Sequence, residues 1–192
     1  MKITRKQLNR IIKESIWDDL GAASDGVRVH KPIHVVNDDT FYWTARRAEE
    51  VQPGFVVPVS GPIERARELE DLYEEARQAL NPTAPSRLNC VYVCPALNGF
   101  CRKPTNRTSI GHQGGIYRVR VTGKVFFADA EYWTEGSFRY GRGDIEGAKS
   151  YAEGYWEGIN PQEARNPDPD YGMYQYHEVL VDGKVEVIER VY

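Results

Sequence analysis

The part of the chain that most constrains the fold is its closing segment, residues 176–191, where two short runs of alternating valines flank an Asp-Gly pair. An Asp-Gly pair favours a two-residue type I′ turn, because both central residues of that turn need a positive φ. Valines that alternate with polar residues are typical of strands with one buried face. The segment therefore predicts a β-hairpin that turns at Asp182-Gly183, with Glu178 held at the start of its first strand.

The composition is that of a soluble globular protein. The 192 residues are 41% hydrophobic and 28% charged, with a formal net charge of −3. This length favours one domain, and no stretch is apolar for long enough to cross a bilayer. The slight acidity argues against a general binder of nucleic acid or of anionic membranes, which would normally show a basic excess, although a local basic patch remains open.

The three cysteines, Cys90, Cys94 and Cys101, form an odd set in a chain without a secretory signal. We therefore expect structural thiols rather than a disulfide framework, and a reducing compartment, the cytoplasm. A zinc site would need all three cysteines with His112 as the fourth ligand. Their spacing is unlike the tight Cys-x2-Cys pairs of common zinc modules, so no metal site is predicted.

Residues 1–20 predict a helical appendage, and the Gly/Ala/Ser-rich residues 21–26 predict a linker to a single domain at 27–192. Thr4 and Gln7 fit a capping box, and apolar residues follow at helical spacing. The opening resembles short leaders of marine tailed-phage proteins. That resemblance implies a capsid or assembly partner for residues 1–20, and the alternative is an amphipathic helix that packs on its own domain or on a partner chain.

The remaining pattern is mixed and predicts an α+β domain with one or two sheets and at least two packed helices. Pro62 and Asn81-Pro82 bound the best helix, and Asp144 and Gly158 bound a second one. The acidic residues of the first helix are most simply a solvated face. Strand candidates and loops complete the domain: strands at 27–36, 41–45, 55–59 and 88–93, a long loop at 95–115, a strand pair at 117–121 and 125–128, and a proline-rich loop at 160–172.

Several separated motifs together carry a resemblance that spans residues 41–191. They are the strand Phe41-Tyr42-Trp43-Thr44-Ala45-Arg46, the helix segment Glu70 to Arg77, Pro85-Ser86-Arg87, Tyr155-Trp156-Glu157-Gly158, and Glu178 with the segment after it. This order resembles a group of bacterial and phage proteins that in turn resembles ADP-ribosyltransferases. The resemblance implies split small sheets with packed helices around a cleft that binds NAD.

The resemblance also implies roles for individual residues. Glu178 would stabilise the oxocarbenium-like state that forms as nicotinamide leaves. Arg46 or Arg87 would grip the pyrophosphate with the guanidinium fork. Aromatic residues of the first strand, Tyr42 and Trp43, or Tyr92, would stack on the cationic nicotinamide, and Thr44 and Ser86 would bond ribose or amide.

Each role has a structural alternative. Tyr42 and Trp43 could be core or edge aromatics, and Trp156 could be core. Arg87 could pair with the acidic face of the 62–80 helix, and Ser86 could cap a turn.

The chain departs from the transferase pattern at two places. Trp43 stands where many members have histidine, and Tyr176 stands where the arginine-modifying branch has an acidic or amide residue. The acceptor, protein or nucleic acid, therefore stays open. The leading hypothesis is NAD-dependent ADP-ribosyl transfer to a host macromolecule by a phage-encoded protein, in the host cytoplasm or packaged in the virion. The alternatives are a non-catalytic binding module on the same fold and a phage structural protein.

Overall fold

The computed structural model describes residues 33–45, 51–60, 66–97, 101, 115–165 and 177–192. The chain divides into two units, residues 1–30 and 31–192, and every described residue lies in the second unit. The helix predicted at 1–20 and the linker predicted at 21–26 lie outside the described residues. So do most of the long loop at 95–115 and residues 166–176.

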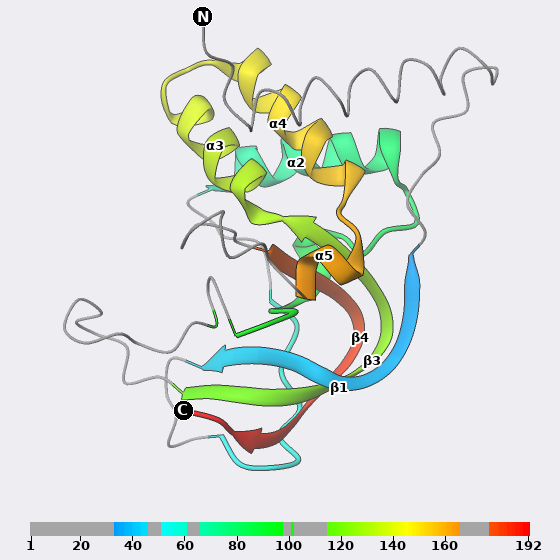
Figure 1. Ribbon diagram of the computed structural model, residues 1–192. Helices are drawn as coiled ribbons and strands as arrows, with labels where there is room; N and C mark the ends of the chain where they lie inside the picture. The colour runs from blue at the N-terminus through cyan, green and yellow to red at the C-terminus, as the bar shows by residue number, and fades with distance from the viewer. Residues whose placement is uncertain (1–32, 46–50, 61–65, 98–100, 102–114, 166–176) are drawn as a thin grey trace, which may run out of the picture. The chain divides into compact units, whose positions relative to one another are not determined.

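The described strands form one antiparallel sheet in the order β1-β3-β4-β2. Its members are β1 (His34–Ala45), β2 (Val91–Val93), β3 (Gly115–Asp129) and β4 (His177–Arg190). The three long strands bend strongly along their length (Figure 1). The bend brings the two edges of the sheet together, since Tyr42 and Cys94 exchange backbone hydrogen bonds of 2.9 and 2.7 Å. The predicted α+β class is confirmed.

Both predicted hairpins are wrong, because each is a single long strand. β4 continues through Asp182-Gly183 without a turn, and β3 continues through Thr122-Gly123 in the same way. The two strands pair with each other, with Gly123 opposite Gly183. A Cβ on Gly123 would lie 2.4 Å from the carbonyl oxygen of Asp182, and one on Gly183 would lie 2.2 Å from that of Thr122. These glycines therefore allow two backbones to approach closely, a use of glycine that an Asp-Gly turn signal does not distinguish.

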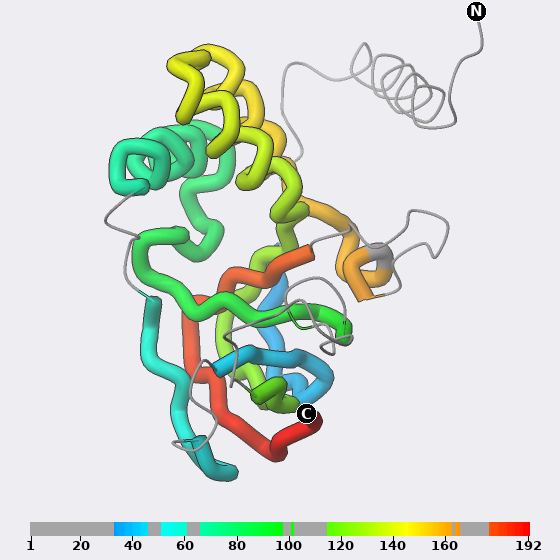
Figure 2. Tube along the Cα trace, turned by 90° about the vertical axis from the view of Figure 1, so that its left-hand side faces the viewer, coloured from blue at the N-terminus to red at the C-terminus, as the bar shows by residue number. Residues whose placement is uncertain are grey.

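Three helices gather at one end of the curved strands, as the two views in Figure 1 and Figure 2 agree. They are α2 (Arg67–Leu80), α3 (Ala130–Gly141) and α4 (Ile145–Glu157); a short helix α5 (Pro161–Arg165) and a 3-10 turn η3 (Arg87–Asn89) complete the described helices. The predicted helices 62–80 and 144–158 correspond to α2 and α4. Asp144 caps α4 by accepting a bond from the Gly147 amide, as its sequence position indicated. None of the helices in the described ranges is both long and apolar enough to cross a membrane.

The two faces of the sheet carry different cores. One face is built mainly of valines from β2, β3 and β4, with Phe41, Tyr117 and Phe127. The other face packs against α2 and α4 through Leu180, Phe126, Tyr155 and Trp156. Successive residues of a strand point to opposite faces, so Val179 joins the valine face while its neighbours Glu178 and Leu180 point toward the helices.

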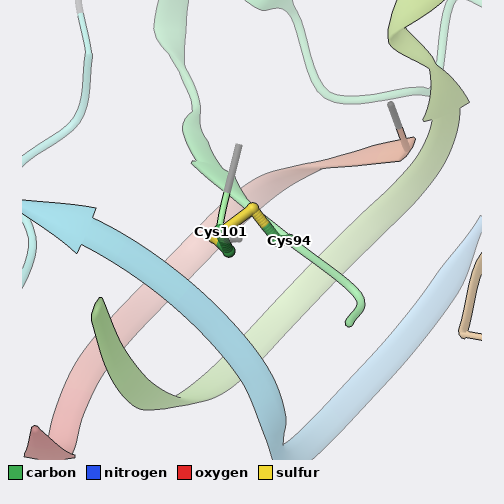
Figure 3. Close-up of a disulfide and its surroundings, with 2 residues drawn as sticks. All are labelled: Cys94 and Cys101. Carbon is green, nitrogen blue, oxygen red and sulfur yellow. A yellow bond between two sulfur atoms is a disulfide. The ribbon is translucent and has the colours of Figure 1, made fainter. Parts of the chain in front are cut away.

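Cys94 and Cys101 form a disulfide (Figure 3), so the expectation of three thiols was wrong for two of them. Their Cα atoms lie 6.1 Å apart, within the range that a disulfide spans. Both are buried beside Ile116 and Tyr42, next to the point where β1 meets the end of β2. Cys90 is free and buried. Within the described ranges, no group of three or more histidine, cysteine or acidic side chains is placed to hold a metal ion.

Candidate functional site

A buried guanidinium, that of Arg87, lies at the centre of the most unusual part of the molecule. Arg87 begins η3 directly after Pro85-Ser86, and it is 4% exposed. Ser86 fixes the start of this turn: its hydroxyl accepts a bond from the Leu88 amide and donates to Glu74 at 2.8 Å. The Pro-Ser-Arg sequence therefore turns the chain so that the arginine enters the space between the helices and the sheet.

Arg87 binds two carboxylates that come from opposite sides of this space. Its Nε donates to Glu70 of α2 at 3.1 Å, and its Nη1 donates to Oε1 of Glu178 on β4 at 2.6 Å. Tyr155 of α4 completes the network, because its hydroxyl accepts from Arg87 at 2.7 Å and donates to the same Oε1 of Glu178 at 2.6 Å. One guanidinium thus connects α2, α4 and β4. We call Glu70, Arg87, Tyr155 and Glu178 the arginine cluster.

Aromatic rings surround the guanidinium. Its central carbon lies 4.1 Å from the ring centre of Trp133, 4.9 Å from Tyr155, 5.2 Å from Tyr92 and 5.8 Å from Tyr73. Arginine stacks well on such rings because its guanidinium is planar and weakly hydrated. The rings also exclude water, which strengthens every ion pair inside them.

The surroundings keep the arginine charged and the tyrosine neutral. Burial by itself would lower the pKa of Arg87, but Tyr155 and Glu178, together with Tyr92 and Glu70, raise it well above the usual arginine value. Burial is the main cause that raises the pKa of Tyr155 well above the usual tyrosine value, and the Arg87 charge only partly opposes it. The tyrosine therefore remains a hydrogen-bond donor to Glu178 across the physiological pH range.

The cluster is not electrically balanced within the described residues, since it contains two carboxylates and one guanidinium. The two carboxylates differ in their access to solvent: the side chain of Glu70 is 2% exposed, and that of Glu178 is 12% exposed. Both donors to Glu178 use Oε1, and no described residue donates a hydrogen bond to Oε2. Among the described residues, Glu178 thus has one oxygen fixed by two donors, the other without a donor, and more acidic than basic side chains around it.

The structure brings together three of the residues implicated by the sequence, Arg87, Glu178 and Tyr92. Arg87 pairs with the acidic helix, as the structural alternative stated, and Ser86 caps a turn, again as its alternative stated. The Arg87 guanidinium bonds to Glu70, Tyr155 and Glu178 and is surrounded by aromatic rings, which leaves it poorly placed to grip a pyrophosphate.

The aromatic strand lies elsewhere. Trp43 packs onto the valine face, against Phe55 and Tyr117, whereas Glu178 points to the opposite face. Tyr42 packs beside the disulfide, and Thr44 is exposed. The structure shows no hydrogen bond between Glu178 and these three residues, and Arg46 lies outside the described residues.

Sequence reasoning missed Trp133 and gave Glu70 and Tyr155 only as parts of motifs. Glu70 has a detectable signal: with Tyr73 and Arg77 it forms an i, i+3, i+7 set that lies on the buried stripe of α2. A charged residue on an apolar stripe needs a buried partner. Trp133 lies on α3, a helix rich in aromatic residues and glycine that the sequence pattern did not indicate.

One family model matches residues 49–192, three quarters of the chain, and its description is "Protein of unknown function (DUF2441)". The chain belongs to this family. The matched region contains the whole arginine cluster and the rings around it, whereas β1 with Tyr42 and Trp43 precedes it. Comparison with curated proteins gave no match.

Proposed function

We propose that the protein transfers ADP-ribose from NAD to a macromolecule, with Glu178 as the carboxylate that stabilises the reacting ribose. The observation that carries this proposal is the state of Glu178: Oε1 is held by Arg87 and Tyr155, Oε2 has no donor among the described residues, and the side chain is the more exposed of the two cluster carboxylates. A carboxylate fixed in this way needs little reorganisation as positive charge develops next to it.

ADP-ribosyl transfer requires a fixed carboxylate of this kind. The bond between the ribose C1 and the nicotinamide nitrogen breaks, its electron pair leaves with the nicotinamide, and positive charge spreads over C1 and the ring oxygen. A nucleophile of the acceptor then forms a bond to C1 and loses its proton. The surplus negative charge of the arginine cluster favours the cationic state at a low local dielectric constant.

In this proposal Arg87 and Tyr155 are positioning residues. Arg87 is enclosed by aromatic rings and pairs with Glu70 as well as Glu178, so it fixes the position of Oε1 of Glu178. This replaces the pyrophosphate-binding role that the resemblance implied for Arg87. The proposal gives no role to Trp43, which packs on the valine face, or to Tyr42, which packs beside the disulfide.

A non-catalytic binding module is the second candidate, and a specific observation favours it. Trp43 packs on the face opposite to Glu178, and Tyr42 packs beside the disulfide, so the residues that the resemblance gathers around NAD are dispersed. Such a module would bind its ligand without breaking a bond.

The test compares the full-length chain with two carboxylate variants, Glu178→Gln and Glu74→Gln. Glu74 is the matched control because it also lies partly buried and accepts four side-chain hydrogen bonds, two from Arg77 and one each from Gln78 and Ser86, yet it bonds to no member of the cluster. We expect Glu178→Gln to lower nicotinamide release from NAD and label transfer to host-lysate proteins by roughly a hundredfold to a thousandfold. Glu74→Gln should leave both rates unchanged, while thermal melts monitor folding of each variant.

Three results would contradict parts of this proposal. Equal rates in all three proteins would remove Glu178 from the chemistry. NAD binding by calorimetry without nicotinamide release would favour the binding module. Absence of both binding and release would remove NAD from either candidate.

A further inference from the structure

The disulfide between Cys94 and Cys101 lies where the two edges of the sheet meet (Figure 3). Tyr42 of β1 and Cys94, which directly follows β2, exchange two backbone hydrogen bonds of 2.9 and 2.7 Å. Among the described residues these bonds form an isolated bridge rather than part of a longer ladder. Tyr42 also packs against the small buried cluster of Cys94, Cys101 and Ile116. We call the hydrogen-bonded pair of Tyr42 and Cys94 the edge contact.

The edge contact is weak without the covalent bond beside it. A backbone hydrogen bond contributes little net stability, because water offers the same partners when the contact opens. A disulfide instead limits the conformations of the open chain, and so it favours the closed form. Cys101 is almost fully buried, and the disulfide ties Cys94 to it across seven positions of the sequence. We therefore expect the state of this bond to set how often the edge contact opens.

The strand β2 connects the edge contact to the arginine cluster. It has three residues and ends directly before Cys94. Tyr92, its central residue, donates from its hydroxyl to the carbonyl oxygen of Arg87 at 2.9 Å. The ring centre of Tyr92 lies 5.2 Å from the central carbon of the Arg87 guanidinium. A displacement of β2 therefore reaches both the backbone and the side chain of Arg87 through one tyrosine.

The same strand also contacts the carboxylate side of the cluster. Val93 pairs with Val179 of β4, and Val179 directly follows Glu178. At the other end of β2, the carbonyl oxygen of Cys90 accepts from the Ser60 amide at 3.0 Å. A strand of three residues makes few bonds along its own length, so the contacts at its two ends contribute much of what holds it in place.

We propose that the Cys94–Cys101 disulfide is a redox switch for the arginine cluster: its reduction by a dithiol opens the edge contact and loosens the position of Arg87. The proposal concerns the geometry of the cluster and does not depend on the reaction proposed for Glu178.

The switching step is a thiol–disulfide exchange. A thiolate of the dithiol attacks one sulfur of the Cys94–Cys101 bond, the S–S bond breaks, and a mixed disulfide forms. The second thiol of the reductant then displaces the protein sulfur. The protein gains two electrons and two protons as two thiols, and the dithiol is oxidised to a cyclic disulfide. Because both half-cystines are buried, the exchange requires a local opening, and the bond and the edge contact stabilise each other.

The experiment measures hydrogen exchange by NMR in the full-length protein before and after reduction with dithiothreitol. We expect the backbone amides of Tyr42 and Cys94, and the Nε–H of Arg87, to exchange at least roughly tenfold faster after reduction, because a cross-link that closes a short loop contributes at least that factor. The amides of Val57 and Ala148 are buried and hydrogen-bonded elsewhere in the domain. They report global unfolding and should keep their exchange rates.

Two cysteine variants separate the bond from other effects of the reductant. The double variant Cys94→Ser with Cys101→Ser should exchange as fast as the reduced wild type at the same three positions, and dithiothreitol should change nothing further. Cys90→Ala is the matched control, since Cys90 is a buried cysteine outside the disulfide. It should respond to dithiothreitol as the wild type does.

The mutual stabilisation of bond and contact gives a second test. Tyr42→Ala removes the ring that packs against the disulfide cluster, so the equilibrium constant for reduction by dithiothreitol should rise by roughly tenfold. Thr44→Ala, at an exposed position of the same strand, should leave this constant unchanged. Alkylation of the released thiols followed by mass spectrometry measures the reduced fraction in each protein.

Four results would overturn the proposal. They are failure of dithiothreitol to reduce the bond in the native protein, unchanged exchange at Tyr42 and Cys94 after complete reduction, and faster exchange there with an unchanged Arg87 Nε–H. The fourth is an equal acceleration at Val57 and Ala148, which would mean that reduction unfolds the whole domain rather than switching one part of it.

Discussion

The two faces of the sheet are both buried, but different interactions hold their side chains together. The valine face buries Val119, Val121, Val125 and their neighbours, and its stability comes from non-directional contact among aliphatic side chains. The helix-covered face buries an arginine, two glutamates and several hydroxyl-bearing rings. Buried hydrogen bonds and ion pairs such as those of the helix-covered face are costly when a partner is missing. Apolar residues of similar volume would stabilise the fold as well, so stability alone does not explain this network.

The helix-covered face is the part of the molecule where a functional site is expected. A valine core tolerates volume-conserving aliphatic changes, whereas a buried ionic network fixes individual atoms in place. Glu178 and Val179 are adjacent in the sequence but belong to these two different environments because strand residues alternate.

The largest expected effect comes from removing the cation of the helix-covered face. Arg87→Met leaves Glu70 and Glu178 without their partner in a buried space, which we expect to lower the free energy of unfolding by about 3–5 kcal/mol. The matched control is Arg118→Met on the same sheet, whose ion pair with Glu189 is largely exposed and should contribute less than about 1 kcal/mol. Urea unfolding followed by circular dichroism measures both. A loss below about 1 kcal/mol for Arg87→Met would show that the cluster is not the stabilising network described.

A smaller effect is expected when a single hydroxyl is introduced into the valine face. Val119→Thr keeps the side-chain shape but places an unpartnered donor at a fully buried position, which should cost about 1–3 kcal/mol. Val35→Thr is the control, since Val35 is 81% exposed and the change there should be nearly neutral. The same urea titrations apply. Equal losses at the two positions would mean that the two faces do not differ as the comparison claims.

The smallest effect concerns Cys90, the free thiol of the helix-covered face. Burial raises its pKa to about 12, so the thiol stays protonated and its alkylation by iodoacetamide at pH 8 should occur only upon unfolding. The folded pKa lies above the unfolded value, and the stability that Cys90 contributes is therefore complete below pH 9 and declines as the pH rises from 9 toward 12. Urea titrations of wild type and Cys90→Ala across this window isolate the contribution. Rapid alkylation of the native chain would contradict the burial.

The sequence indicated those elements whose signals are local. The apolar stripe of α2 and the Asn81-Pro82 stop, and the Asp144 cap and Gly158 end of α4, follow from spacing of 3.6 residues and from capping chemistry. The sequence singled out Glu178, and the structure buries it against Arg87 and Tyr155, a pairing that the sequence did not indicate. Contacts between distant segments were missed, since Glu70 lies on another element from Arg87 and Glu178. The Cys94–Cys101 bond spans only seven residues, and it was missed because the odd number of cysteines favoured free thiols.

The predicted hairpins failed for a related reason. A glycine that follows an aspartate satisfies a turn and a close strand crossing equally well, and only the partner strand decides between them. In this chain the partner of Gly183 is Gly123, which belongs to a strand on the far side of α3, α4 and α5 in the sequence.

The pairing of Gly123 with Gly183 has a consequence for biosynthesis. A hairpin would assemble from neighbouring residues as soon as they leave the ribosome, but β3 must wait for β4, the last strand to be synthesised. Before β4 is synthesised, one edge of β3 has no partner strand, and the valines that will face inward remain exposed to other chains. The native sheet is therefore complete only once β4 has been synthesised, and a premature stop before His177 would remove the strand that pairs with both β3 and β2.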